Sequence, residues 1–240
     1  MKLQRKGTRH SHRGVIGVES AIVMIAFVIV AAALAFVVLN MGFTTSQKAK
    51  TTIMAGLGES SSSMQIAGKV TAVGCTSSSS DTTCATTPKI NATAFPLRLT
   101  PGGDSIDLGT ATTAVKYLSN SVEYDDIYSG PITSEEHRTL RGAFEEANTD
   151  SLTGFSGDSI NPINGTVASQ TAAFIYWSVQ YNTNQVLDQG EHAALAIGFA
   201  SSERPTALDK IRVEIIPATG ASLSVERQIP TITTSIVDMG

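Results

Sequence analysis

The sequence predicts an α+β protein in which a long N-terminal helix precedes an antiparallel β-sandwich or barrel-like domain. Residues 21–39 contain no charge and no hydrogen-bonding side chain, and this run is close to the roughly 20 residues of a membrane-spanning helix. From about residue 65, short runs rich in β-branched and aromatic residues alternate with Gly, Pro, Asn and Asp, which is typical of strands joined by turns.

Charged residues are distributed unevenly along the chain. Residues 1–14 hold five basic side chains and no acid, whereas the remainder holds 12 Lys and Arg against 21 Asp and Glu. A basic head before an apolar run fits the positive-inside rule for membrane segments. Because the body of the chain is acidic, nucleic acid is not expected as a partner. We therefore divide the chain into a leader (1–14), a long helix (15–60) and a β-rich domain (65–240).

The first half of the predicted helix is apolar enough for a membrane, and its second half, "TTSQKAKTTIMAGLGES", is more polar. Glycines and the stretch "ESSSSM" (59–64) indicate its end. The clearest strands are "AAFIYWSVQY" (172–181), "HAALAIGFA" (192–200), "KIRVEIIP" (210–217) and "ASLSVERQIP" (221–230). In the third of these, "IRVEI" alternates apolar and polar residues, as a half-buried antiparallel strand should. The segment 134–147 fits either a short helix or a polar loop.

Motifs for catalysis and for resident metals are not found in the sequence. The four histidines are His10, His12, His137 and His192, and none has the spacing of paired metal ligands. There is no phosphate-binding loop and no nucleophile elbow. An enzyme is therefore not expected, and neither is a cofactor. The acidic stretch "EYDD" (123–126) fits a solvated loop, with an incidental calcium site at Glu123, Asp125 and Asp126 as the alternative.

Two features depend on the chain being outside the cell. Cys75 and Cys84 flank a polar loop, and in an oxidising compartment we expect them to form a disulfide; two unrelated thiols are the alternative. Asn91 and Asn164 begin Asn-x-Thr triplets, which are acceptor sites for N-glycosylation in exported chains. We expect both asparagines to be exposed and at least one to carry a glycan.

The N-terminal segment, "RGVIGVESAIVMIAFVIVAAALAFVVLNMGFTTSQKAKTTI", resembles the N-terminus of archaeal flagellins, the archaellins. The similarity is strongest over residues 13–54. It is weaker in "YWSVQYNTNQVLDQGEHAALAI" and "RVEIIPATGASLSVERQIP", and weakest between about 70 and 170. By this resemblance a class III leader is cut between Gly14 and Val15, with Gly17 at the third mature position.

The resemblance implies a structural subunit whose helices bundle into the core of a motility filament and whose β-domains form its sheath. It also implies a prepilin-peptidase-like leader peptidase, a membrane assembly platform, a transient membrane stage of the precursor and an extracellular filament. The filament would be a homopolymer or a copolymer with paralogous archaellins. The alternatives are a type IV-like adhesion pilin, a solute-binding protein with the same leader, and a simple membrane-anchored protein.

Glu19 is an acid at the start of an otherwise apolar run. Cleavage after Gly14 would create an α-amino group at Val15, and pairing with the Glu19 carboxylate would offset part of the cost of burying both charges. Such a pair could form within one helix or across subunits, and we expect it to serve assembly or membrane extraction. The alternative is that Glu19 caps the helix N-terminus, which is worth about 0.3–1 kcal/mol.

Overall fold

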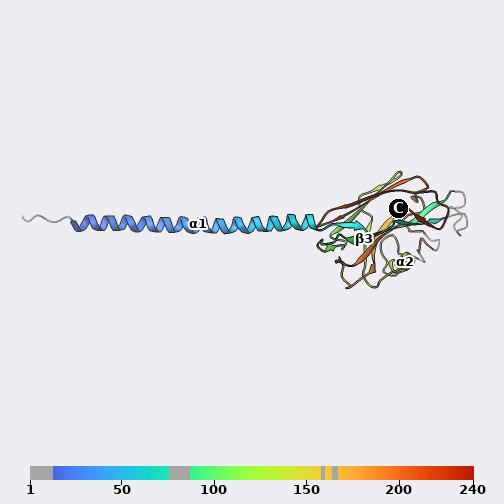
Figure 1. Ribbon diagram of the computed structural model, residues 1–240, viewed down its shortest axis with the longest axis horizontal. Helices are drawn as coiled ribbons and strands as arrows, with labels where there is room; N and C mark the ends of the chain where they lie inside the picture. Colours follow the sequence, from blue (N-terminus) through green and yellow to red (C-terminus); the bar gives the residue numbers. More distant parts are fainter. Residues whose placement is uncertain (1–12, 76–86, 158–159, 164–166) are drawn as a thin grey trace, which may run out of the picture. The chain divides into compact units, whose positions relative to one another are not determined.

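The computed structural model describes residues 13–75, 87–157, 160–163 and 167–240. The chain forms two compact units, of which the first ends at Ala55 and the second comprises Gly56–Gly240. The first is most of one long helix, and the second is a β-rich domain (Figure 1).

The predicted long helix is confirmed, and it is slightly longer than expected. Helix α1 (Arg13–Ser61) has 49 residues and contains no proline, so no position in it lacks a backbone donor. Glycines at 56 and 58 weaken its last turns because glycine costs about 1 kcal/mol relative to alanine within a helix. The Ser62 N–H still donates to Gly58 O at 2.9 Å, after which the chain becomes extended.

The larger of the two main sheets has seven strands in the order β13-β2-β3-β10-β8-β7, with β1 also pairing with β3. Its strands are β1 (Met64–Ile66), β2 (Thr71–Cys75), β3 (Lys89–Leu99), β7 (Tyr128–Ile132), β8 (Ala172–Val179), β10 (His192–Gly198) and β13 (Ile236–Asp238). All pairs are antiparallel except β7 with β8, which is parallel. The strands predicted at 172–181 and 192–200 are the adjacent β8 and β10.

The second sheet has four strands in the order β12-β11-β5-β6. These are β5 (Thr113–Ser119), β6 (Glu123–Tyr124), β11 (Lys210–Pro217) and β12 (Leu223–Gln228). A small third sheet pairs β4 (Ile106–Asp107) with β9 (Val186–Leu187). The main core joins residues of both larger sheets, among them Leu97, Trp177 and Leu195 with Tyr117 and Val213, which confirms the predicted sandwich.

A second core contains side chains of the seven-stranded sheet and helix α2 (Leu140–Thr149). Phe144 of α2 packs edge-to-face against Phe155 and Phe174, with ring centroids 5.4 and 5.1 Å away. The Thr139 hydroxyl caps α2 by accepting from the Gly142 N–H at 3.2 Å. Of the two interpretations of 134–147, the helix is correct from Leu140 onward, whereas the preceding residues are not helical.

Candidate assembly surface

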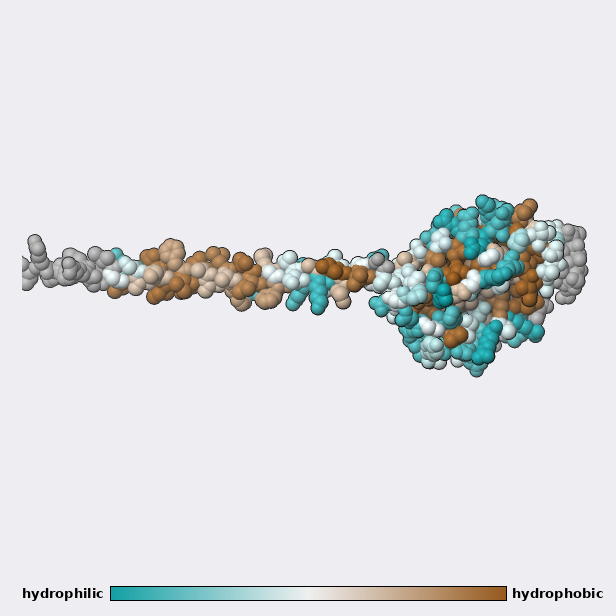
Figure 2. Space-filling model, in the orientation of Figure 1, coloured by the Kyte–Doolittle hydropathy of each residue, from teal (hydrophilic) through white to brown (hydrophobic). Residues whose placement is uncertain are grey.

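The side chains of α1 are exposed on every side of the helix from residue 17 to residue 57. Large apolar side chains dominate this surface, and Figure 2 shows them gathered along the first part of the helix. They include Ile22, Phe27, Leu34, Phe36, Leu39, Phe43, Ile53 and Leu57, each more than half exposed. The segment Gly17–Glu59 is also long and apolar enough to cross a membrane by length and composition. A helix that is apolar all round needs cover from lipid or protein, so this surface is the candidate functional site.

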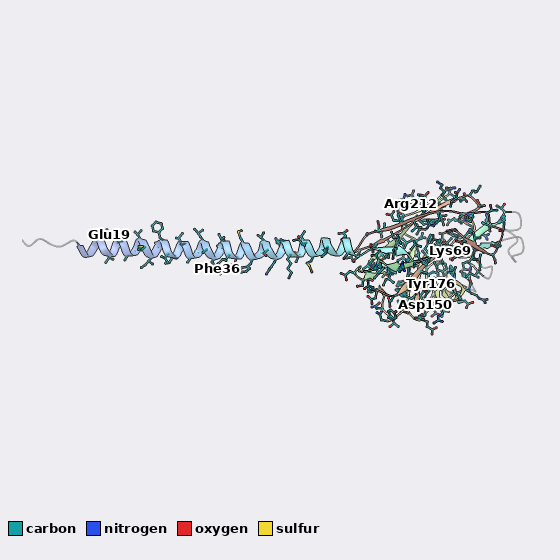
Figure 3. All side chains as sticks on the ribbon, viewed as in Figure 1. Glu19, Phe36, Lys69, Asp150, Tyr176 and Arg212 are labelled. Atoms are coloured by element: carbon teal, nitrogen blue, oxygen red, sulfur yellow. The ribbon has the colours of Figure 1, made fainter. Side chains whose placement is uncertain are left out.

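Charge on the described surface of α1 is confined to a few positions. Between residues 17 and 59 the charged side chains are Glu19, Lys48, Lys50 and Glu59. Glu19 is followed by 28 uncharged residues before the two lysines. Glu19 and Phe36, labelled in Figure 3, both project outward from the helix. The surface therefore consists of a long neutral stretch with Glu19 before it and two lysines followed by Glu59 after it.

The predicted leader junction lies inside the first turn of α1. Gly14 and Val15 are the second and third helical residues, and the first turn contains no acid. Glu19 is the seventh helical residue, and the helix dipole effect falls off within the first turn. In the uncleaved chain, Glu19 is therefore poorly placed to cap the helix. Cleavage after Gly14 would make it the fifth residue of the mature chain, which brings it near the new N-terminus.

Gly17 has open space around it. A Cβ atom built on Gly17 would meet no other atom within 4 Å. Packing within the described chain therefore does not require glycine at this position. Its predicted role in processing or assembly stays a prediction.

The expected exposure of Asn91 is wrong. Asn91 is only 4% exposed, and both ends of its amide are engaged. Its Nδ2 donates to Pro162 O at 3.0 Å, and its Oδ1 accepts from Arg204 Nη1 at 3.0 Å. A glycan on Nδ2 would displace these contacts, so the folded domain does not present Asn91 as an acceptor. Asn164 lies outside the described residues.

A β-bulge explains the burial of Asn91. In the pairing of β2 with β3, Val73 lies opposite Ala92 and the next residue, Gly74, lies opposite Ile90. Asn91 is therefore the extra residue, which is how a bulge re-aims a side chain. Across this bulge Ile90 belongs to the main core, whereas Ala92 belongs to the second core.

The predicted disulfide involves one described residue. Cys75 ends β2, is 1% exposed and is disulfide-bonded. The chain has two cysteines, and the other, Cys84, lies outside the described residues. The Cys75–Cys84 pairing stays a prediction, and the bonded state of Cys75 supports it.

The three carboxylates of the acidic stretch at 123–126 contact groups of the described chain. Glu123 and Asp125 both contact Lys116 Nζ, at 3.3 and 2.9 Å. These hydrogen bonds, that of Asp125 first, raise the pKa of the Lys116 ammonium. Asp126 instead accepts from the backbone N–H groups of Val115 and Tyr128. In the described part of the chain, no group of three or more His, Cys, Asp or Glu side chains could hold a metal ion.

One buried acid was not singled out in the sequence. Glu191 is 1% exposed, and its carboxylate accepts from Trp177 Nε1, Tyr181 N and Asp188 N at 3.3, 2.8 and 3.0 Å. These three donors come from β8 and from the loops on either side of β9. The local sequence "DQGEH" resembles an ordinary polar turn, so nothing in it indicates this role.

Comparison with known proteins places the chain in a family. A model of archaeal-type flagellins matches residues 14–227. The chain is an archaeal-type flagellin. "Probable flagellin 1" of Aeropyrum pernix is 34% identical over 226 residues, which cover 91% of this chain and 92% of the relative. "Probable flagellin 2" of Archaeoglobus fulgidus is 35% identical over 115 residues, which cover 48% of this chain and 55% of the relative.

Two solved structures share the fold of this flagellin. The archaeal flagellum of Methanospirillum hungatei matches with a TM-score of 0.56 at 22% identity, covering 92% of this chain and 98% of the other. A crystal structure of an archaeal flagellin from Methanocaldococcus jannaschii matches with a TM-score of 0.54 at 13% identity, covering 74% and 96%. The likeness to the first structure covers 92% of this chain, so it includes most of the long helix as well as the β-domain, as the sequence predicted.

Proposed function

We propose that this flagellin is a structural subunit that polymerises through α1 into the filament of the archaeal flagellum and serves swimming motility. The observation that carries the proposal is the surface of α1, which is apolar on all sides and exposed along its length. The area of one such helix is large, and each buried Val, Leu, Ile or Phe side chain contributes about 1.5–3 kcal/mol. A bundle of copies would bury it.

Membership of a structural family also supports a non-enzymatic role. The β-domain packs around two hydrophobic cores of its own. We propose that the domain forms the outer surface of an extracellular filament. Archaeoglobus fulgidus has two flagellins similar to this chain, which supports copolymerisation with paralogues as well as a homopolymer.

We further propose that the precursor passes through the cell membrane and loses residues 1–14. The match to the family model begins at Gly14, and α1 has the length and composition of a membrane span. A prepilin-peptidase-like enzyme would cut before Val15, and a membrane assembly platform would then extract the helix. N-terminal sequencing of filament protein should begin at Val15, and a start at Met1 would contradict this maturation.

The decisive experiment is deletion of the gene, followed by complementation. We expect the deletion strain to lose the filaments that contain this chain and to stop spreading in soft agar, with both restored by the wild-type gene. An adhesion pilin predicts a different result, because attachment to surfaces would fail while swimming persisted. Retention of both filaments and swimming in the deletion strain would contradict a main structural role.

A further inference from the structure

A pocket of about 340 Å³ lies within the β-domain. Its walls come from the segment 124–129, which includes β6 and the start of β7, from Thr153 after α2, and from Gln170 and Thr171 just before β8. Ligand pockets in proteins measure roughly 300–1,000 Å³, so the volume suits a small ligand. The assembly role proposed for α1 makes no use of this pocket.

The lining of the pocket favours one class of ligand. Every lining residue except Ile127 has a polar atom in its side chain, and Asp126 is the one charged residue among them in the described part of the chain. An apolar ligand would leave these polar groups without partners, and an anion would be repelled by Asp126. An uncharged ligand with several hydroxyl groups satisfies the lining best.

Two aromatic rings of the lining are held in place. Tyr124 and Tyr128 are half-buried and pack against the main core. The Tyr124 hydroxyl donates to Glu203 Oε1 at 2.7 Å, and the other oxygen of this carboxylate accepts from the Thr171 hydroxyl at 2.5 Å. The Tyr128 hydroxyl donates to Leu108 O at 2.5 Å. Because both rings are fixed before a ligand arrives, little side-chain entropy is lost on binding.

The pocket also offers polar groups that the fold does not use. Asp126 Oδ1 accepts from the backbone N–H groups of Val115 and Tyr128 at 3.1 and 3.0 Å, which orients the carboxylate and leaves Oδ2 as an acceptor. Thr153 and Gln170 are exposed, and their side chains make no hydrogen bond within the described chain. A carboxylate oxygen, a hydroxyl and an amide together can accept and donate, as sugar hydroxyls require.

We propose that this pocket binds the terminal, uncharged sugar residue of a glycan. The apolar face of the sugar ring packs against Tyr124 and Tyr128, because the face of an aromatic ring attracts weakly positive C–H groups. The sugar hydroxyls bond to Asp126 Oδ2, Thr153 and Gln170. This inference goes beyond the proposed function, since every residue involved lies in the β-domain. A filament would repeat the pocket in each copy, and many weak contacts would add up to firm attachment.

Saturation-transfer NMR tests the proposal on the full-length chain, purified in a detergent without sugar head groups. The probes are the methyl glycosides of glucose, galactose, mannose and N-acetylglucosamine, which imitate a terminal residue. We expect at least one to bind, and Thr153→Val/Gln170→Ala to weaken its binding at least about tenfold. Thr183→Val/Gln189→Ala is the matched control: both residues are exposed, do not line the pocket and make no side-chain hydrogen bond within the described chain. It should bind like wild type.

Several results would overturn the sugar site. They are binding of none of the four glycosides, equal weakening in the two double variants, and displacement of the bound glycoside by putrescine, which would reveal a cation site. Added salt should leave the affinity unchanged, because screening acts only on charges. Filaments and swimming should be normal in Thr153→Val/Gln170→Ala, so a failure of sugar binding and a failure of the proposed function are separate results.

Discussion

The Arg204 guanidinium donates to the Asn91 side-chain oxygen at 3.0 Å in the interior of the β-domain, and both residues are 4% exposed. Asn91 in turn donates to Pro162 O. The Asn91 side chain, at the bulge of β3, therefore bonds both to Arg204, in the segment after β10, and to Pro162. This arrangement makes Asn91 a structural residue.

Two substitutions remove the sequon at Asn91, and they separate the structural role of the asparagine from its possible use as a glycan acceptor. Asn91→Ala should destabilise the domain by about 1–3 kcal/mol, because it leaves buried groups without partners. Thr93→Val also abolishes the sequon, but the Thr93 hydroxyl is buried and has no hydrogen-bond partner among the described residues. We expect Thr93→Val to leave stability unchanged or to raise it. Urea unfolding of residues 56–240 measures both, and a glycan found on Asn91 in intact filaments would contradict its structural role.

Replacing Glu191 with Gln should destabilise the domain by about 2–3 kcal/mol, since hydrogen bonds to a charged group are worth about 1.5–3 kcal/mol. The new NH₂ group would face an N–H donor instead of accepting from it. Trp177, the sole tryptophan of the chain, donates to Glu191, so its fluorescence reports the unfolding. Glu145→Gln is the control: Glu145 makes an exposed i,i+4 pair with Arg141 and should contribute less than about 0.5 kcal/mol. Equal effects of the two substitutions would contradict the prediction.

Gly198 leaves space for the aromatic rings of the second core. A Cβ atom there would lie 2.6 Å from Phe155 Cε1 and 3.3 Å from Phe144 Cε1. Gly198→Ala should therefore cost about 1–3 kcal/mol through overpacking. Gly68→Ala is the matched control, because the nearest atom to its Cβ would be 3.8 Å away. Thermal unfolding should show a lower Tm for the first variant alone.

Asp209 should make part of the domain's stability dependent on pH. Burial raises its pKa, but hydrogen bonds from the Thr206 backbone and hydroxyl and from Asn120 outweigh burial and lower it overall. A lowered pKa contributes stability that is present above the ordinary value, about 3.9, and is lost as the pH falls through the folded-state value. Asp209→Asn should therefore be less stable than wild type at pH 7, with the difference shrinking in acid. A difference that stays constant from pH 7 to pH 2 would contradict this.

The predicted disulfide can be tested directly. Replacing both Cys75 and Cys84 with Ser should lower the stability of the domain by up to about 3 kcal/mol, because the bridge would close a loop of about ten residues. Filaments should still form, since the apolar surface of α1 is unchanged. Non-reducing peptide mapping of wild-type filaments should yield the linked pair, and two free thiols would refute it.

The parts of the fold that sequence reasoning predicted are those with local patterns. The long helix follows from an apolar run without proline, and β11 follows from the alternation in "IRVEI". The parallel pairing of β7 with β8 is not predictable in this way, because it joins residues more than 40 positions apart. Strand β3 is buried on both faces over most of its length, so alternation does not mark it.

Some features of the candidate site could likewise be predicted from the sequence, and others could not. The charged and apolar positions on the surface of α1 can be read directly from the sequence. No other described part of the chain covers this surface, so its properties do not depend on tertiary contacts. Burial of Asn91 and Glu191 is not visible, because it depends on a bulge and on loop segments brought together by the sheets. An Asn-x-Thr triplet carries no information about burial, so the expectation of exposure at Asn91 had no structural basis.

The first residues after α1 also have a mechanical consequence. Ser62 O accepts from Ala221 N at 2.9 Å, and the Ser63 carbonyl accepts from Thr100 N at 3.0 Å, so the chain is fastened to two separate segments as soon as the helix ends. In the proposed filament, drag on a β-domain is resisted by α1, and the load passes through this short joint. In chain order, the bonds of Ser62 and Ser63 come directly before the pairing of β1 with β3, which begins with Met64 opposite Leu99. The joint is therefore where a subunit under torque would begin to yield.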